Sequence, residues 1–120
     1  MIGVEFLLTL IVAHYVGDFV LQTSDMATKK SHSAFWLSAH VAVYTATLAL
    51  FTVWYWSTAY FIAWLITNAV LHWFVDYTTS RLNAEYQKRS EVKAFWNCIG
   101  ADQAMHYVSL ILTTYFFLIV

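Results

Sequence analysis

The stretch Asn68-Ala-Val-Leu-His72-Trp-Phe-Val-Asp76 ends a long apolar run and places an imidazole and a carboxylate four residues apart. Residues four apart lie on the same face of an α-helix, close enough to share a ligand. A histidine and an aspartate in an apolar helix are costly to bury unless they pair with, or bind, another group. The stretch therefore predicts a membrane-type helix that carries a polar site.

The same spacing occurs twice more, as His14 with Asp18 and, in reverse order, as Asp102 with His106. Five histidines and four aspartates in 120 residues would give only about a third of one such pair by chance. Three pairs are present, and this excess indicates that the pairs serve a common purpose.

The composition is that of a membrane protein. Hydrophobic residues make up 61% of the sequence and charged residues 11%, against about 25% charged residues in a typical soluble domain. A soluble bundle of 120 residues could not bury so much apolar surface. We therefore expect one domain over residues 1–120, in contact with the lipid bilayer. The net charge of −1 excludes a general basic field for nucleic acid, and the lone Cys98 excludes an internal disulfide.

We expect an all-α, polytopic membrane protein with a bundle of four transmembrane helices. The expected spans, each about long enough to cross a bilayer, are residues 2–22, 34–56, 59–79 and 101–120. The first and third connectors are basic, whereas the second is aromatic and uncharged. By the positive-inside rule the basic connectors face the cytoplasm. The expected location is then the bacterial inner membrane, with both termini outside the cytoplasm.

This topology places the three His/Asp pairs and the lone His40 at one depth, in the cytoplasmic half of the membrane. The candidate metal ligands are His14, Asp18, His40, His72, Asp76, Asp102 and His106. Imidazole and carboxylate together suit Zn, Mn or Fe, and seven candidates exceed the four ligands of a tetrahedral zinc. Two ions would also fit. Some of the aspartates could instead orient a ligating histidine, or simply hydrogen-bond two helices together.

Further polar residues continue these helix faces toward the expected cytoplasmic side. Gln22 follows Asp18 by four residues, and Gln103 is next to Asp102. Together with basic connector residues they give the candidate substrate-binding residues Gln22, Lys29, Lys30, Arg81 and Gln103. The basic residues could serve only to orient the protein in the membrane, as the positive-inside rule requires. Alternatively, they could bind a phosphate or an anionic lipid headgroup. No catalytic residue is assigned.

Five segments together match one family pattern. They are His14-Tyr-Val-Gly-Asp-Phe-Val-Leu-Gln22, a lysine after it (Lys29 or Lys30), His40, His72 with Asp76, and Asp102-Gln-Ala-Met-His106. On these residues, over nearly its whole length, the chain resembles the DUF3307 family of small bacterial and phage integral membrane proteins. That family's pattern carries a lysine after the third-helix aspartate, where this chain has Arg81. The resemblance implies a membrane protein with a shared polar site, and no established activity.

The leading functional hypothesis is a metal-dependent hydrolase that attacks a membrane-associated substrate, with a phosphoester lipid as the preferred class. One alternative is a subunit that transports divalent cations or protons, because buried Asp and His chains serve such roles. Another is a haem protein with two axial histidines, such as His40 and His106. The last is a phage or bacterial interaction protein without enzymatic activity. Lipid-facing surface also leaves room for a homo-oligomer.

Overall fold

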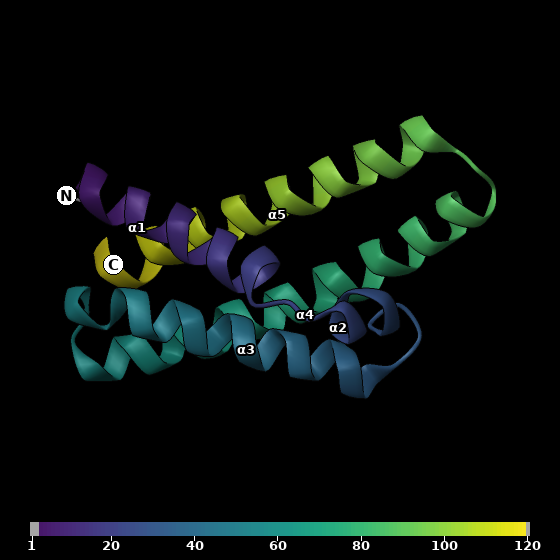
Figure 1. Cartoon of the computed structure of the whole chain (residues 1–120). Helices are drawn as coiled ribbons and strands as arrows, with labels where there is room; N and C mark the ends of the chain where they lie inside the picture. The colour runs from purple at the N-terminus through teal and green to yellow at the C-terminus, as the bar shows by residue number, and fades with distance from the viewer. Residues whose placement is uncertain (1–2, 120) are drawn as a thin grey trace.

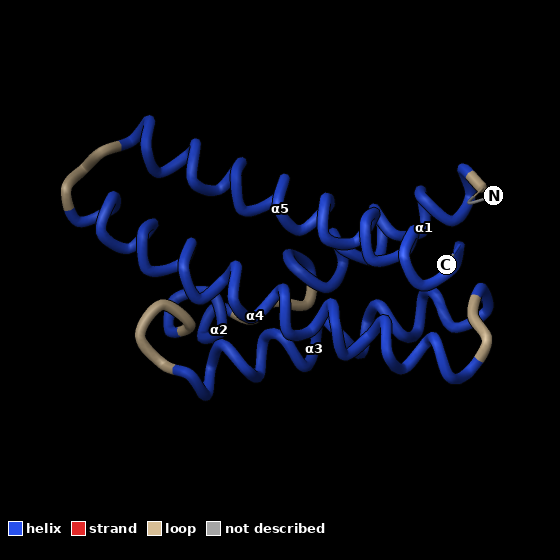
Figure 2. The backbone as a smooth tube through the Cα atoms, turned by 180° about the vertical axis from the view of Figure 1, so that it is seen from behind, coloured by secondary structure: helices blue, strands red, loops and turns tan. Residues whose placement is uncertain are grey.

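The computed structural model describes residues 3–119, and over those residues the regular structure is helical throughout. The elements are α1 (Val4–Tyr15), the π-helix η1 (Val16–Val20), α2 (Ser24–Lys29), α3 (Ala34–Thr52), the 3-10 helix η2 (Val53–Tyr55), α4 (Thr58–Lys88) and α5 (Val92–Ile119). The predicted all-α class is confirmed. Successive long helices are antiparallel. Both termini lie at one end of the bundle, and α2 and the α4–α5 turn lie toward the other (Figure 1). Figure 2 shows from behind that loops occur only near the helix ends.

Two helical segments are long and apolar enough to cross a membrane, Ala34–Tyr55 and Ala59–Lys88. This supports membrane association, but two such segments are found in the described part of the chain where four were expected. The first expected span is shortened because α1 has only 12 residues before the backbone changes to the π-helix. The last is made less apolar by the polar residues of α5, among them Asp102, Gln103 and His106.

The polar connector expected between the third and fourth spans is mostly helical. α4 continues to Lys88 and α5 begins at Val92, so the two helices form one long hairpin. The end of α4 is a Schellman motif, in which the Glu91 N–H bonds the Tyr86 carbonyl at 2.9 Å and Ser90 has a φ of 55°. No glycine or proline marks this helix end, so the sequence offered only the polar composition, which predicted a connector between the two spans.

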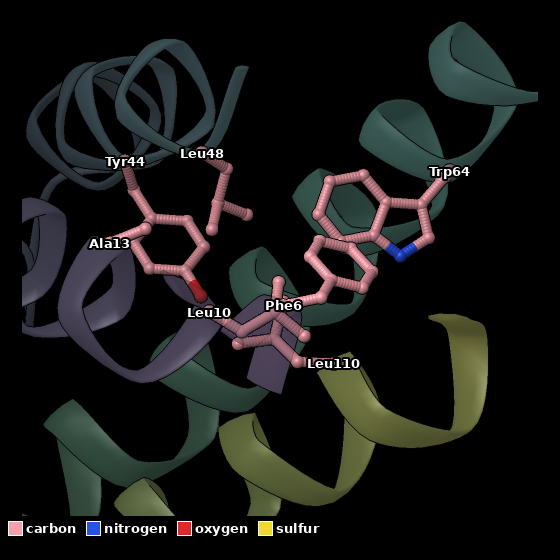
Figure 3. Close-up of a cluster of buried hydrophobic side chains, with 7 residues drawn as sticks. All are labelled: Phe6, Leu10, Ala13, Tyr44, Leu48, Trp64 and Leu110. Atoms are coloured by element: carbon pink, nitrogen blue, oxygen red, sulfur yellow. The ribbon is translucent and has the colours of Figure 1, made fainter. Parts of the chain in front are cut away.

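The helices pack around an apolar core in the half of the bundle that holds the termini. Figure 3 shows its buried side chains, which come from α1, α3, α4 and α5: Phe6, Leu10, Ala13, Tyr44, Leu48, Trp64 and Leu110. The Trp64 indole donates to the Thr114 hydroxyl at 3.2 Å, which satisfies the one polar atom of that ring. In a bilayer such a core acts through close packing more than through removal from water. It leaves the opposite half of the bundle for polar groups.

The π-helix brings η1 unusually close to α3. The Leu21 N–H bonds the Val16 carbonyl at 2.9 Å, five residues back, which is the π-helical pattern. At Gly17 an added Cβ would lie 3.1 Å from Cδ2 of Tyr44 and 3.3 Å from Cβ of Thr47. The missing side chain at Gly17 therefore lets η1 press against α3, and this contact carries the neighbouring Asp18 into the bundle.

Replacing Gly17 with valine should lower the free energy of unfolding by about 1–3 kcal/mol, because the added atoms overfill a tight contact. The measurement is thermal unfolding in detergent, followed by circular dichroism. Gly100→Ala is the matched control, since nothing lies within 4 Å of a Cβ there. That helical substitution should stabilise the protein by up to about 1 kcal/mol. Equal unfolding temperatures for Gly17→Val and wild type would contradict this account of the η1–α3 contact.

Candidate metal centre

All seven predicted ligands lie close together, between the first helical segment (α1 with η1), α3, α4 and α5. We call them the His/Asp cluster: His14, Asp18, His40, His72, Asp76, Asp102 and His106. Six are buried, and Asp102 keeps 15% of its side-chain surface. The cluster lies directly beyond the apolar core, and Tyr44 belongs to the boundary between them. The seven side chains thus lie close together, and their common depth in a membrane stays a prediction.

Four atoms of the cluster form a compact group, which we call the first ligand group: Asp18 Oδ1, His40 Nε2, His72 Nε2 and Asp76 Oδ2. His40 Nε2 lies 3.0 Å from the Asp18 oxygen, 3.2 Å from His72 Nε2 and 3.2 Å from the Asp76 oxygen. His72 Nε2 lies 3.4 Å and 3.5 Å from the same two oxygens. These atoms thus point at a common centre from η1, α3 and α4.

Ordinary hydrogen bonds cannot use all of these approaches. A neutral imidazole carries at most one N–H on Nε2, and that hydrogen can be directed well at only one acceptor. The Nε2 atoms of His40 and His72 face each other. Either one of them carries a hydrogen that it donates to the other, or a cation lies between them. Ligands 2.0–2.1 Å from a tetrahedral zinc lie about 3.4 Å from one another. The five separations that involve a histidine nitrogen, 3.0–3.5 Å, lie near that edge length, and all four atoms lie within 4.8 Å of one another.

A second set of atoms adjoins the first. Asp18, Asp102 and His106 can each place one ligand atom within 4.8 Å of the others; we call them the second ligand group. His106 Nε2 lies 3.3 Å from Asp102 Oδ2 and 2.9 Å from Asp76 Oδ1. Asp76 therefore turns one oxygen to each group, and Asp18 is shared by both. Carboxylates placed between two ligand groups are the usual bridges of two-ion sites.

Aromatic stacking sets the orientation of the imidazoles. The Tyr44 ring stacks on His72 with centroids 3.9 Å apart, and His72 stacks on His106 at the same separation with an interplanar angle of 12°. This stack fixes the direction of both Nε2 atoms. The buried Nδ1 atoms of His40 and His72 have no hydrogen-bond partner among residues 3–119. The Nε2 edge is therefore where these two rings make their polar contacts.

His14 lies beside the ligand groups rather than in them. Its Nδ1 is 2.9 Å from the Tyr44 hydroxyl and its Nε2 is 2.7 Å from Gln103 Oε1. The Gln103 amide in turn donates to Asp18 at 2.9 Å and to Asp102 at 3.0 Å. His14 thus acts through Gln103, which ties two of the carboxylates together. Gln103 has a central place that its position next to Asp102 did not reveal.

Of the basic residues expected at the site, Lys30 reaches the cluster. Its Nζ donates to Asp76 Oδ2 at 2.9 Å, and only 17% of the side chain is exposed. Lys29 instead pairs with Asp25 at the surface, and Arg81 lies on the Tyr77 ring at 3.6 Å from its centroid. Three carboxylates and one ammonium leave two negative charges uncompensated within the cluster. One divalent cation, or two protonated imidazoles, would balance them.

Three residues near the cluster were missed by the sequence analysis. Thr79 donates a hydrogen bond to Asp102, and Ser80 and Asn83 follow it on α4. They come three, four and seven residues after Asp76, on a helix face that continues past the expected end of the third span. Ser80 and Asn83 lie beyond the expected end of that span, in the stretch predicted to be a connector. Outside the cluster, Asn68 links α4 to α5 through Thr113 at 2.9 Å, and His32 is exposed in a turn.

In chelator-treated protein, Lys30→Gln should lower the free energy of unfolding by about 1–3 kcal/mol, because the buried Asp76 carboxylate loses its cationic partner. Lys29→Gln removes the same charge from the adjacent position and should change stability by less than about 0.5 kcal/mol, as is usual for an exposed pair. Chemical denaturation of both variants in detergent gives the comparison. Equal effects of the two substitutions would show that the Lys30–Asp76 pair does not stabilise the fold.

Comparison with known proteins gives one match. No curated protein and no solved structure matches the chain. A model of a protein family of unknown function, DUF3307, matches residues 6–120, which include the whole His/Asp cluster. The match agrees with the resemblance seen on the His/Asp pairs, and on this evidence the chain belongs to the DUF3307 family.

Proposed function

We propose that the protein is a membrane-embedded, metal-dependent hydrolase whose first ligand group holds a divalent ion. The observation that carries this proposal is the set of separations of 3.0–3.5 Å among four buried ligand atoms. Imidazole nitrogen with carboxylate oxygen is a donor set typical of Zn, Mn or Fe. The ion would also offset the two uncompensated negative charges of the cluster, which would otherwise be costly to bury.

The chemistry would be attack by an activated water on an ester. A bound divalent ion lowers the pKa of its water and polarises the ester oxygen. The water oxygen then adds to the phosphorus or acyl carbon, the bond to the leaving oxygen breaks, and the proton lost by the water ends on the leaving group. The second ligand group could hold a second ion that stabilises the leaving oxygen. If only the first ligand group holds an ion, the partly exposed Asp102 would be free to accept the water proton.

The bundle would sit in the bacterial inner membrane with the His/Asp cluster in its cytoplasmic half. Many large apolar side chains face outward, among them Leu50, Ile66 and Leu112, and lipid would cover such a surface. In this arrangement the first helical segment and α5 pack beside α3 and α4 to complete the four-helix bundle. Both termini would lie outside the cytoplasm, since α2, which ends at the basic residues Lys29 and Lys30, and the α4–α5 turn share the opposite end.

Proton or cation transport is the second candidate. The contacts from His14 through Gln103 and Asp18 to His40 form a continuous polar chain, as a proton relay would need. A route to the other membrane face would have to pass the apolar core, which holds Leu10, Leu48 and Trp64. That barrier favours an enzyme that works from one face. A purely structural interaction protein would need no ion in the cluster.

Metal analysis of detergent-purified protein tests the proposal. Wild type, loaded with zinc and freed of excess, should hold one or two ions per chain. His72→Ala should lose the ion of the first ligand group, whereas Asp102→Ala should retain it and lose only a second ion. His32→Ala is the matched control and should bind as wild type does, because that histidine is exposed in a turn.

Helical circular dichroism confirms that each variant is folded before its metal content is compared. A wild-type protein that retains no metal after loading would overturn the proposal. So would hydrolysis of a fluorogenic phosphoester that continues undiminished after the metal is removed by a chelator. Ion or proton flux in liposomes, in the absence of hydrolysis, would instead favour transport.

A further inference from the structure

A polar pocket of about 180 Å³ opens directly beside the His/Asp cluster. Its walls include Asp18 and Asp102 on the cluster side, and Gln22, Lys30, Ser80 and Asn83 on the other. The pocket thus touches both ligand groups through their carboxylates. It is where a substrate of a metal ion in the cluster would have to bind.

The far wall of the pocket carries polar atoms that nothing else satisfies. Gln22 Oε1, Ser80 Oγ and Asn83 Oδ1 are buried without a hydrogen-bond partner among the described residues. Buried polar atoms are nearly always paired, so three in one small pocket indicate a ligand or ordered water. The amide orientations of Gln22 and Asn83 can be exchanged, which allows either to donate as well as accept.

The pocket is reached from the side of α2. A second cavity of about 280 Å³ shares Lys30, Ser80 and Asn83 with it and is lined further out by Thr28 and Gln87. Both cavities lie on the side of the cluster away from the apolar core. A ligand could therefore enter from the end of the bundle that holds α2, without crossing the core.

We propose that this pocket binds the phosphate group of a phosphoester substrate, with Lys30, Ser80, Asn83 and Gln22 contacting its oxygens. The inference rests on the proposed function, because the nearby carboxylates would repel an anion unless metal ions neutralise them. With one divalent ion the cluster and Lys30 are neutral together, and with two they carry two positive charges. Two charges match a phosphate monoester dianion, whereas a neutral ester or amide would need no such excess.

The size of the pocket limits what enters it. A volume of about 180 Å³ admits a phosphate group, and a longer substituent on it would extend into the adjoining cavity of about 280 Å³. The reaction is the hydrolysis already described: water oxygen bonds to phosphorus, the P–O ester bond breaks, and inorganic phosphate and an alcohol leave. Lipid phosphate and free phosphate esters share this chemistry.

Phosphorus NMR titrations test the proposal on zinc-loaded protein in detergent. The probes are inorganic phosphate and, as the lipid form, dihexanoylphosphatidic acid below its micelle concentration. Ser80→Ala combined with Asn83→Ala should weaken binding of both probes at least tenfold while zinc content stays at the wild-type value. Thr78→Val is the matched control, since the Thr78 hydroxyl is exposed and bonds the Phe74 carbonyl. Lys30→Gln should weaken binding further than Lys29→Gln.

Each outcome bears on the pocket separately from the metal. Zinc-loaded wild type that binds neither probe, or binds them as well after Ser80→Ala with Asn83→Ala, would overturn the pocket and leave the metal centre standing. A wild type that holds no zinc would overturn both. Tighter binding of the lipid probe than of phosphate would identify a lipid substrate, and equal binding would identify a soluble phosphoester.

Discussion

The structure depends on how three carboxylates are kept inside an apolar helical bundle. Asp18 and Asp76 are almost fully buried and Asp102 partly so, yet one lysine is the only fixed cation that contacts them within the described residues. Burying unbalanced charge in an apolar medium is costly. The imidazoles of His40, His72 and His106 contact these carboxylates. They act either as hydrogen-bond donors to the carboxylates or, with them, as ligands of a metal ion. The balance of that charge is the physical problem that any function of this protein must solve.

The rest of the fold serves this arrangement. Gly17 and the π-helix let η1 approach α3, which brings Asp18 to His40. Tyr44 belongs at once to the apolar core and to the site, because it stacks on His72 and bonds His14. Local π-helices recur at functional sites because they redirect side chains from a regular helix face. Packing, backbone geometry and site geometry are thus coupled through a few contacts.

Much of this could be predicted because His72–Asp76, and the other pairs, obey the helical period. The period gives the helix face, and the antiparallel order of the helices brings these faces to the same region of the bundle, so the cluster follows. The π-helix could not be predicted, since it accompanies a tertiary contact, the close approach of η1 to α3 at Gly17. Neither could the length of α4, because the left-handed residue that follows its end is Ser90 and not a glycine. Gln103 donates to carboxylates on two different elements, Asp18 and Asp102, which its place in the sequence does not show. Asn83 was missed because it lies on a helix that was expected to have ended.

X-ray absorption at the zinc edge of the loaded protein tests the central claim most directly. If the zinc is bound by the His/Asp cluster, the spectrum should show nitrogen and oxygen neighbours at about 2.0–2.1 Å. It should also show the longer-range scattering of coordinated imidazole. The spectrum should contain no sulfur contribution, since Cys98 is not among the ligand atoms. A spectrum without imidazole scattering, or one with a sulfur neighbour at about 2.3 Å, would place the ion elsewhere and contradict the account.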